Sequence, residues 1–264
     1  MRHNRMTVAD LRARKGKGQM SMLFVENTDE AAAAAAGIDI LSIIQPIWTP
    51  EMRKAAGNCF VQVGLLYGDL VTAEDYLRAA HRAIQIGGDA VYCAASLDTV
   101  ARLAAEGIPV ISHVGLIPSK NTWTGGFKAV GKTAASAVAI YQHVKQLEAA
   151  GAIGVEIEVV PARVTEEIAK RTSLILLSMG AGVGGDAQYL FSEDVLGCTK
   201  VHRPRHAKVY RNFRAEFERL QAERIAAFAE FKADVDNSVY PEQKHLVPMA
   251  DAEFAAFVEA LPPV

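Results

Sequence analysis

The sequence has little of what membrane, secreted or nucleic-acid-binding proteins require. Its three cysteines, Cys59, Cys93 and Cys198, are odd in number and widely spaced, which favours neither a disulfide framework nor a thiolate metal site. It has no run of about 18 apolar residues that could span a membrane, and its basic N-terminal segment lacks the apolar centre of a secretory signal. The formal net charge of −2 leaves no excess positive charge for nucleic-acid phosphates. We therefore expect a cytoplasmic protein whose partners are small molecules.

A linker rich in proline, glycine or serine is also absent. Half of the residues are apolar, which is enough for one large core. We therefore predict a single domain over residues 1–264, with an N-terminal helix at about 7–16. Helices from about residue 212 would cover the main body. The alanine run at 31–36 favours helix over a low-complexity spacer.

Short apolar runs rich in Val, Ile and Leu recur along the chain, each followed by a segment with helical spacing. Seven lie at residues 22–25, 38–44, 59–65, 89–93, 108–115, 154–160 and 173–180, and we expect an eighth at DVLG, residues 194–197. Strands that are apolar on both faces and separated by helices indicate a parallel sheet covered by helices. We predict a (β/α)8 barrel, with an open doubly wound sheet as the alternative.

Two glutamates interrupt the apolar run GVEIEVV. Glu156 and Glu158 are two residues apart, so they lie on one face of the strand. An ionised carboxylate is costly to bury unless it is paired or used. Both could instead face solvent or form ion pairs with Arg163 or with a neighbouring strand. Because barrel enzymes carry their chemistry at the C-terminal ends of strands, Glu158 is the candidate general base. Glu156 would pair with a partner or adjust the pKa of that base.

His113 ends the preceding apolar run at the same level, where it is either a structural side chain or a substrate contact. The following stretch, PSKNTWTGGFKAVGKT, shows no clear secondary structure. Its glycines, Trp123 and lysines 120, 128 and 132 suit a mobile lid over an anionic substrate, or an ordinary surface loop. MGAGVGGD could cradle a phosphate after the seventh strand, but we favour tight packing at the barrel rim.

Six stretches resemble the ketopantoate hydroxymethyltransferase family, in the family's order: TVADLRARKGKG, HVGLIPS, GGFKAVGKT, EAAGAIGVEIEVVP, MGAGVGGD and DVDNSVYPEQKH. The family belongs to the phosphoenolpyruvate mutase and isocitrate lyase superfamily. The resemblance implies a barrel, usually a homo-oligomer, that adds a one-carbon unit from 5,10-methylenetetrahydrofolate beside the carbonyl of a branched 2-oxo acid. It also implies that Glu158 removes the substrate proton and that His113 contacts the substrate.

The resemblance breaks at the metal site. The family holds magnesium with two aspartates and a nearby glutamate, and the matching positions are Gln45, Gly64 and Ala94. Tyr92 stands where the family has a lysine. A metal chelated by the substrate contributes several kcal/mol to enolate formation, so a bound magnesium ion is doubtful here. Hydrogen-bond donors at His113, Gln45 and Tyr92 would replace part of that effect. We expect the substrate site to contain His113, Gln45, Tyr92 and Gly64.

Three functions remain open. The leading hypothesis is an enzyme that forms or cleaves a carbon–carbon bond next to the carbonyl of a 2-oxo acid or related compound. Glu158 would be its base, and it would lack the family's magnesium site. The first alternative is a superfamily lyase or hydrolase that acts on another carbonyl compound. The second is a non-catalytic ligand-binding or regulatory paralogue.

Overall fold

The computed structural model describes residues 5–199 and 203–263. The chain divides into two compact units, Met1–Arg211 and Asn212–Val264, and each is considered by itself below. The expected single domain over residues 1–264 remains a prediction.

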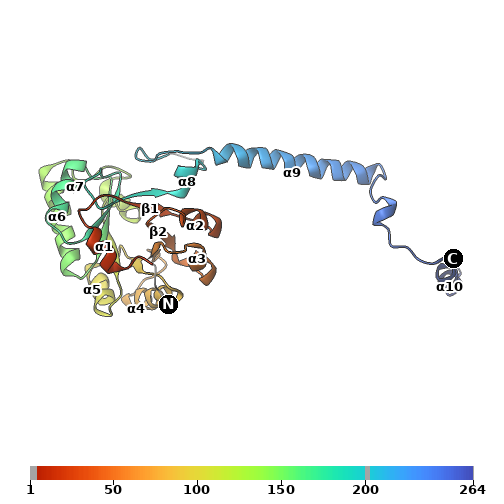
Figure 1. Cartoon of the computed structure of the whole chain (residues 1–264), viewed down its shortest axis with the longest axis horizontal. Helices are drawn as coiled ribbons and strands as arrows, with labels where there is room; N and C mark the ends of the chain where they lie inside the picture. Colours follow the sequence, from red (N-terminus) through yellow and green to blue (C-terminus); the bar gives the residue numbers. More distant parts are fainter. Residues whose placement is uncertain (1–4, 200–202, 264) are drawn as a thin grey trace. The chain divides into compact units, whose positions relative to one another are not determined.

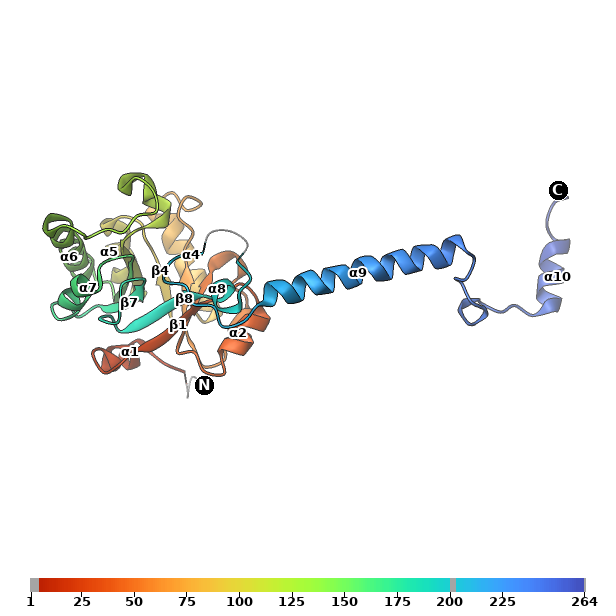
Figure 2. The same ribbon diagram turned by 90° about the horizontal axis from the view of Figure 1, so that it is seen from above.

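Eight parallel strands form a closed barrel in the order β1 to β8 (Figures 1 and 2). Each strand pairs with its neighbour in the sequence, and β1 also pairs with β8, which closes the sheet. The strands are β1 Met20–Phe24, β2 Ile40–Ile44, β3 Phe60–Gly64, β4 Ala90–Tyr92, β5 Val110–Gly115, β6 Gly154–Glu158, β7 Ile175–Met179 and β8 Ala187–Phe191. The predicted (β/α)8 barrel is confirmed, and the open sheet is wrong.

Helices follow most strands and surround the barrel (Figure 2). They are α1 Val8–Arg14, α2 Thr28–Ala34, α3 Pro50–Ala55, α4 Ala73–Ile86, α5 Leu97–Ala105, α6 Ala134–Ala149, α7 Ala162–Ala169 and α8 Ser192–Leu196. Two short 3-10 helices are η1 Gln45–Ile47 and η2 Pro118–Thr124. The predicted N-terminal helix is α1, where Thr7 and Asp10 cap each other's backbone reciprocally.

The eighth strand lies at Ala187–Phe191, so the prediction of a strand at residues 194–197 is wrong. Those residues belong to the end of α8. Glu193 and Asp194 occupy its first turn, where carboxylates favour a helix N-terminus. Gly197 ends the helix with a φ of 75°, the left-handed conformation that glycine adopts readily. A window of four residues with two apolar members cannot distinguish a strand from a helical turn.

Side chains of the strands alternate between two sides of the barrel wall. One set packs against the helices, and the other fills the barrel interior. Near the N-terminal ends of the strands the interior is apolar, with Ile40, Phe60 and Ile111 buried there. Toward the C-terminal ends it becomes polar. The buried polar side chains in this region are Ser42, Gln62, His113, Glu156 and Glu158.

The second unit contains α9 Phe213–Asp236, the 3-10 helix η3 Gln243–His245 and α10 Asp251–Glu259. The side chain of Asn212 caps α9. Helices therefore occur where the sequence predicts them from about residue 212, while their expected role in covering the barrel remains a prediction. Within residues 5–199 and 203–263, no helix combines the length and apolar character needed to cross a membrane.

Candidate active site

Glu158 is the last residue of β6. Its register partners are Gly115 on β5 and Met179 on β7, so it lies at the C-terminal end of the barrel. The residue is only 7% exposed, so the alternative that it faces solvent is wrong. Val159, which follows it, has a φ of 49°, a conformation that β-branched residues rarely adopt. Strained backbone of this kind concentrates at functional sites.

His113 lies between the two glutamates of β6. Its Nε2 is 3.3 Å from Oε2 of Glu158, and its Nδ1 is 3.5 Å from Oε2 of Glu156. Nδ1 also lies 2.9 Å from the hydroxyl oxygen of Tyr92, whose ring meets the imidazole edge-on. Nε2 is buried and has no hydrogen-bond partner among the described residues. One imidazole thus connects two carboxyl groups and a phenol within the barrel.

Glu156 lies one step deeper and is 5% exposed. Its Oε1 accepts a hydrogen bond from Nε2 of Gln62 at 2.6 Å, and the same nitrogen donates to Oγ of Ser42 at 3.2 Å. Burial raises the pKa of Glu156 to about 7, because desolvation of the carboxylate outweighs the favourable effects of His113 and Gln62. The charge of Glu158 adds to this rise. Near neutral pH, both protonation states of Glu156 are therefore accessible.

Two tyrosines complete this polar group, the half-buried Tyr92 and the buried Tyr189. Burial, together with the nearby Glu156 and Glu158 carboxylates, raises the pKa of both Tyr92 and Tyr189 well above the usual value. Both phenols therefore keep their protons and act as hydrogen-bonding groups rather than as bases.

Three members of this group are missed by sequence reasoning, namely Ser42, Gln62 and Tyr189. Ser42 and Gln62 are single polar residues in otherwise apolar strands, whereas Tyr189 shares its strand with Gln188. That signal is present in the sequence, but a single polar residue does not reveal which face of a strand it occupies. For Tyr189 the strand itself lies outside the predicted one.

The positions that the resemblance assigns to metal ligands lie side by side. Gln45 directly follows β2, Gly64 ends β3, and Ala94 lies two residues beyond β4. The register pairs Ile44 with Gly64 and Gly64 with Tyr92. Gln45 carries an amide, Gly64 has no side chain and Ala94 carries only a methyl group. Magnesium prefers carboxylate oxygens as ligands, so these residues do not fit that ion. No cluster of three or more His, Cys, Asp or Glu suited to a metal occurs in the part of the chain that the structure describes.

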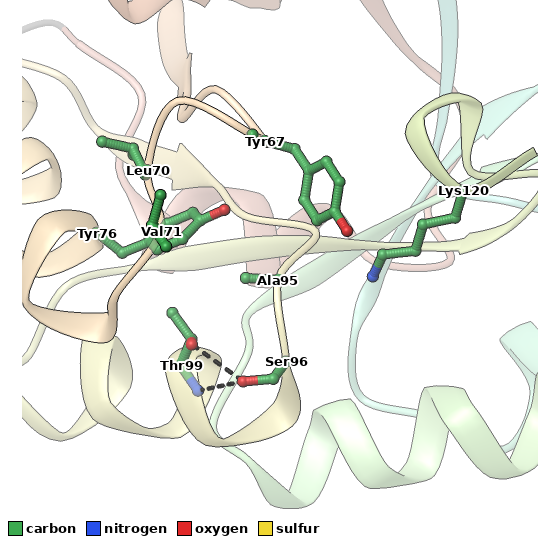
Figure 3. A pocket seen from close by; sticks show the side chains of 9 residues that line it. Tyr67, Leu70, Val71, Tyr76, Ala95, Ser96, Thr99 and Lys120 are labelled. Atoms are coloured by element: carbon green, nitrogen blue, oxygen red, sulfur yellow. Dashed lines mark hydrogen bonds between the residues drawn. The ribbon is translucent and has the colours of Figure 1, made fainter.

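A cavity of about 520 Å³ opens beside Ala94, over the C-terminal ends of β3 and β4 (Figure 3). It is lined by Tyr67, Gly68, Leu70, Val71, Tyr76, Ala95, Ser96, Thr99 and Lys120. Nζ of Lys120 donates to the carbonyl oxygen of Ala94 at 2.6 Å and lies 5.4 Å from the centre of the Tyr67 ring. Burial lowers the pKa of this lysine.

Lys120 belongs to the stretch expected to lack secondary structure, which instead contains η2. Lys128 and Lys132 are exposed. Of the three lysines proposed to face an anionic substrate, Lys120 is therefore the one that turns toward a cavity. Trp123, at the end of the same helix, is 90% exposed.

Close packing explains the glycines of MGAGVGGD. A Cβ at Gly182 would overlap Ala162, and one at Gly184 would overlap Glu166, both on α7. The interpretation of this loop as a tightly packed rim is consistent with these contacts.

The ketopantoate hydroxymethyltransferase family model matches residues 47–243 of the chain. The chain belongs to this family. A relative, the 3-methyl-2-oxobutanoate hydroxymethyltransferase of Thermus thermophilus, is 32% identical over 265 residues, which cover 91% of this chain and 99% of that protein. The enzyme of the same name from Geobacillus kaustophilus is 31% identical over 213 residues, covering 79% of this chain and 74% of the relative. Family membership supports a transferase function.

Comparison with solved structures supports the fold. The structure of 2,3-dimethylmalate lyase, a member of the phosphoenolpyruvate mutase and isocitrate lyase superfamily, matches with a TM-score of 0.51 at 12% identity. The match covers 97% of this chain and 99% of the lyase. The predicted family is thus confirmed by the sequence matches, while the likeness to the lyase supports the barrel fold alone.

Proposed function

We propose that this family member removes a proton next to the carbonyl of a small 2-oxo acid and forms or cleaves a carbon–carbon bond there. Glu158 is its general base, and it acts without the family's magnesium site. The observation that carries this proposal is the buried Glu158 carboxylate at the end of β6, 3.3 Å from His113. The relatives are named for 3-methyl-2-oxobutanoate, which makes this branched 2-oxo acid the first substrate to test.

Removing this proton leaves negative charge on the carbonyl oxygen, and the site must stabilise that charge. The three positions that the resemblance assigns to the metal site are Gln45, Gly64 and Ala94, and none of them carries a carboxylate. Without a metal, hydrogen-bond donors that point at the carbonyl oxygen can stabilise the negative charge that develops there. The amide of Gln45 and the hydroxyl of Tyr92 lie at the appropriate ends of their strands, with Gly64 between them leaving space for substrate.

The carboxylate of the substrate also needs a partner. Lys120 places a positive charge beside Ala94, in the cavity at the ends of β3 and β4. Its ammonium group can attract a small organic anion, a role that the metal ion would share in a magnesium-dependent enzyme. If one-carbon transfer is retained, 5,10-methylenetetrahydrofolate is the expected donor. A homo-oligomeric assembly and a cytoplasmic location also remain predictions.

Solvent-deuterium exchange tests the proposal. The protein is incubated with 3-methyl-2-oxobutanoate and related 2-oxo acids in D2O, and loss of the carbon-bound proton next to the carbonyl is followed by NMR. We expect exchange by the native protein and a rate lower by about 10²- to 10⁴-fold in Glu158→Gln. Glu106→Gln, which changes an exposed glutamate at the end of α5, is the control.

Two results would oppose the proposal. Equal exchange rates for the native protein and Glu158→Gln would show that Glu158 is not the base. Absence of exchange with every 2-oxo acid would favour a lyase or hydrolase acting on another carbonyl compound, or a non-catalytic paralogue. Where exchange occurs, adding 5,10-methylenetetrahydrofolate and measuring the hydroxymethylated product tests the complete transfer.

A further inference from the structure

We propose that Glu156 is a positioning residue that fixes the tautomer of His113, so that Nε2 of His113 receives the proton that Glu158 removes from the substrate. This proposal rests on the proposed role of Glu158 as the base. It adds a second carboxyl group and an imidazole to the proton path.

The two ring nitrogens of His113 have different surroundings. Nδ1 faces two oxygen atoms, the Tyr92 hydroxyl at 2.9 Å and Oε2 of Glu156 at 3.5 Å. Both oxygens can accept a hydrogen bond from an Nδ1–H group. Nε2 faces Oε2 of Glu158 at 3.3 Å and makes no hydrogen bond within the described residues. A proton on Nδ1 can therefore be donated to one of these two oxygens. The lone pair of Nε2 then points at Glu158.

The carboxyl group of Glu156 is held firmly enough to set this orientation. The register pairs Glu156 with His113 across β6 and β5, so the two side chains leave neighbouring backbone positions. Gln62 is fully buried and donates to Oε1 of Glu156 at 2.6 Å, which leaves Oε2 to face the imidazole. Ser42 fixes the Gln62 amide in turn.

The proton moves from the substrate to His113 in two steps. The carbon–hydrogen bond next to the carbonyl breaks, and its electron pair stays on the substrate as an enolate. The proton forms an O–H bond on Glu158, and that bond breaks as an N–H bond forms at Nε2 of His113. Glu158 returns to its ionised state, and the imidazolium lies between two carboxyl groups. Glu156 then plays the part of the carboxylate in a Ser-His-Asp triad, which orients and stabilises the imidazole without taking its proton.

The protonation state of Glu156 matters for this role. The titratable groups that face it are His113 on β5, Glu158 on β6, Tyr92 on β4 and Tyr189 on β8. With a pKa of about 7, Glu156 is mainly ionised at a pH of about 8. The tautomer should therefore be measured there.

NMR of the full chain with ¹⁵N-labelled histidine tests the proposal without any substrate. The His113→Gln variant identifies the signals of this ring among the seven histidines. In the native protein at a pH of about 8 we expect the proton on Nδ1. In Glu156→Gln we expect it on Nε2, donating to Glu158. Gln62 would keep the amide oxygen at the Oε1 position, so an NH2 donor would face Nδ1 where a carboxylate oxygen now lies. Glu106→Gln should leave the native pattern unchanged.

A native protein that carries the proton on Nε2 would overturn the proposal, as would an unchanged tautomer in Glu156→Gln. If Glu156→Gln does not fold, the measurement on the native protein still decides, and Glu156→Asp keeps a carboxylate for comparison. In the exchange assay, Glu156→Gln should lower kcat by at least about tenfold with little change in KM. If the tautomers follow expectation but Glu158→Gln exchanges at the native rate, the proposed function fails while the positioning role of Glu156 stands.

Discussion

A Cβ on Gly115 would overlap the backbone carbonyl oxygen of Glu158. The two residues are register partners at the ends of β5 and β6. Leu116, the next residue, donates its backbone N–H to the same carbonyl oxygen at 3.0 Å. Gly115 also has a φ of 89°, which favours glycine. The strand end that carries the candidate base is therefore held by a close backbone approach that only glycine permits.

Gly115→Ala should lower the free energy of unfolding by about 2–4 kcal/mol, because it combines a left-handed φ with overlap against β6. Gly107→Ala is the matched control. Gly107 has a φ of 74° but open space where a Cβ would lie, so we expect a cost of about 1 kcal/mol. Urea unfolding of both variants measures the difference. Equal losses in the two variants would contradict the argument from crowding.

Restoring carboxylates should create a magnesium site. The variant Gln45→Asp/Gly64→Asp/Ala94→Glu places three carboxylates at neighbouring strand ends, and a Cβ at Gly64 meets its neighbours at an ordinary 3.6 Å or more. Magnesium at about 100 times its Kd would stabilise this variant by about 2.7 kcal/mol. The native protein should show no change in Tm with magnesium or with EDTA. A rise in the native Tm with magnesium would refute the proposed loss of the site.

The pH dependence of stability should reveal Glu156. Its pKa is raised from 4.5 to about 7, so the folded protein holds this proton more tightly than the unfolded chain does. The resulting stabilisation is fully present below about pH 4.5 and is lost as the pH rises to about 7, a change of about 3 kcal/mol.

Unfolding free energies of the native protein and Glu156→Gln, measured from pH 4.5 to 8, isolate this effect. Groups remote from Glu156 titrate alike in both proteins and cancel in the difference. The native protein should lose its relative advantage as the pH rises. A difference that stays flat across this range would show that Glu156 does not titrate there.

Lys120→Met should raise the KM for 2-oxo acid exchange about tenfold, because it removes the charge beside Ala94 while keeping much of the apolar side chain. Lys128→Met changes an exposed lysine of the same segment and should leave KM unchanged. Initial exchange rates over a range of substrate concentrations provide both constants. If both variants raise KM equally, the effect comes from overall charge rather than from the cavity.

The sequence alone determined the barrel, because apolar strands and capped helices are local patterns with characteristic periods. It also led to the family and to Glu158 and His113, since both residues lie in recognisable strands. Glu158 ends β6, whereas His113 lies two residues before the end of β5 and pairs in register with Glu156 rather than Glu158. It failed for the eighth strand, because the two apolar residues before Gly197 fit a helical turn as well as a strand.

Only the tertiary structure decided which polar side chains meet. Gln62 and Glu156 are 94 positions apart, and Tyr189 comes from a strand that the sequence pattern misplaces. Their contacts depend on the stagger of a closed sheet, which no single segment encodes. The same closure excludes water from the barrel interior, and this desolvation raises the pKa of Glu156. Its position in the strand is local information, whereas its proton affinity is a property of the assembled barrel.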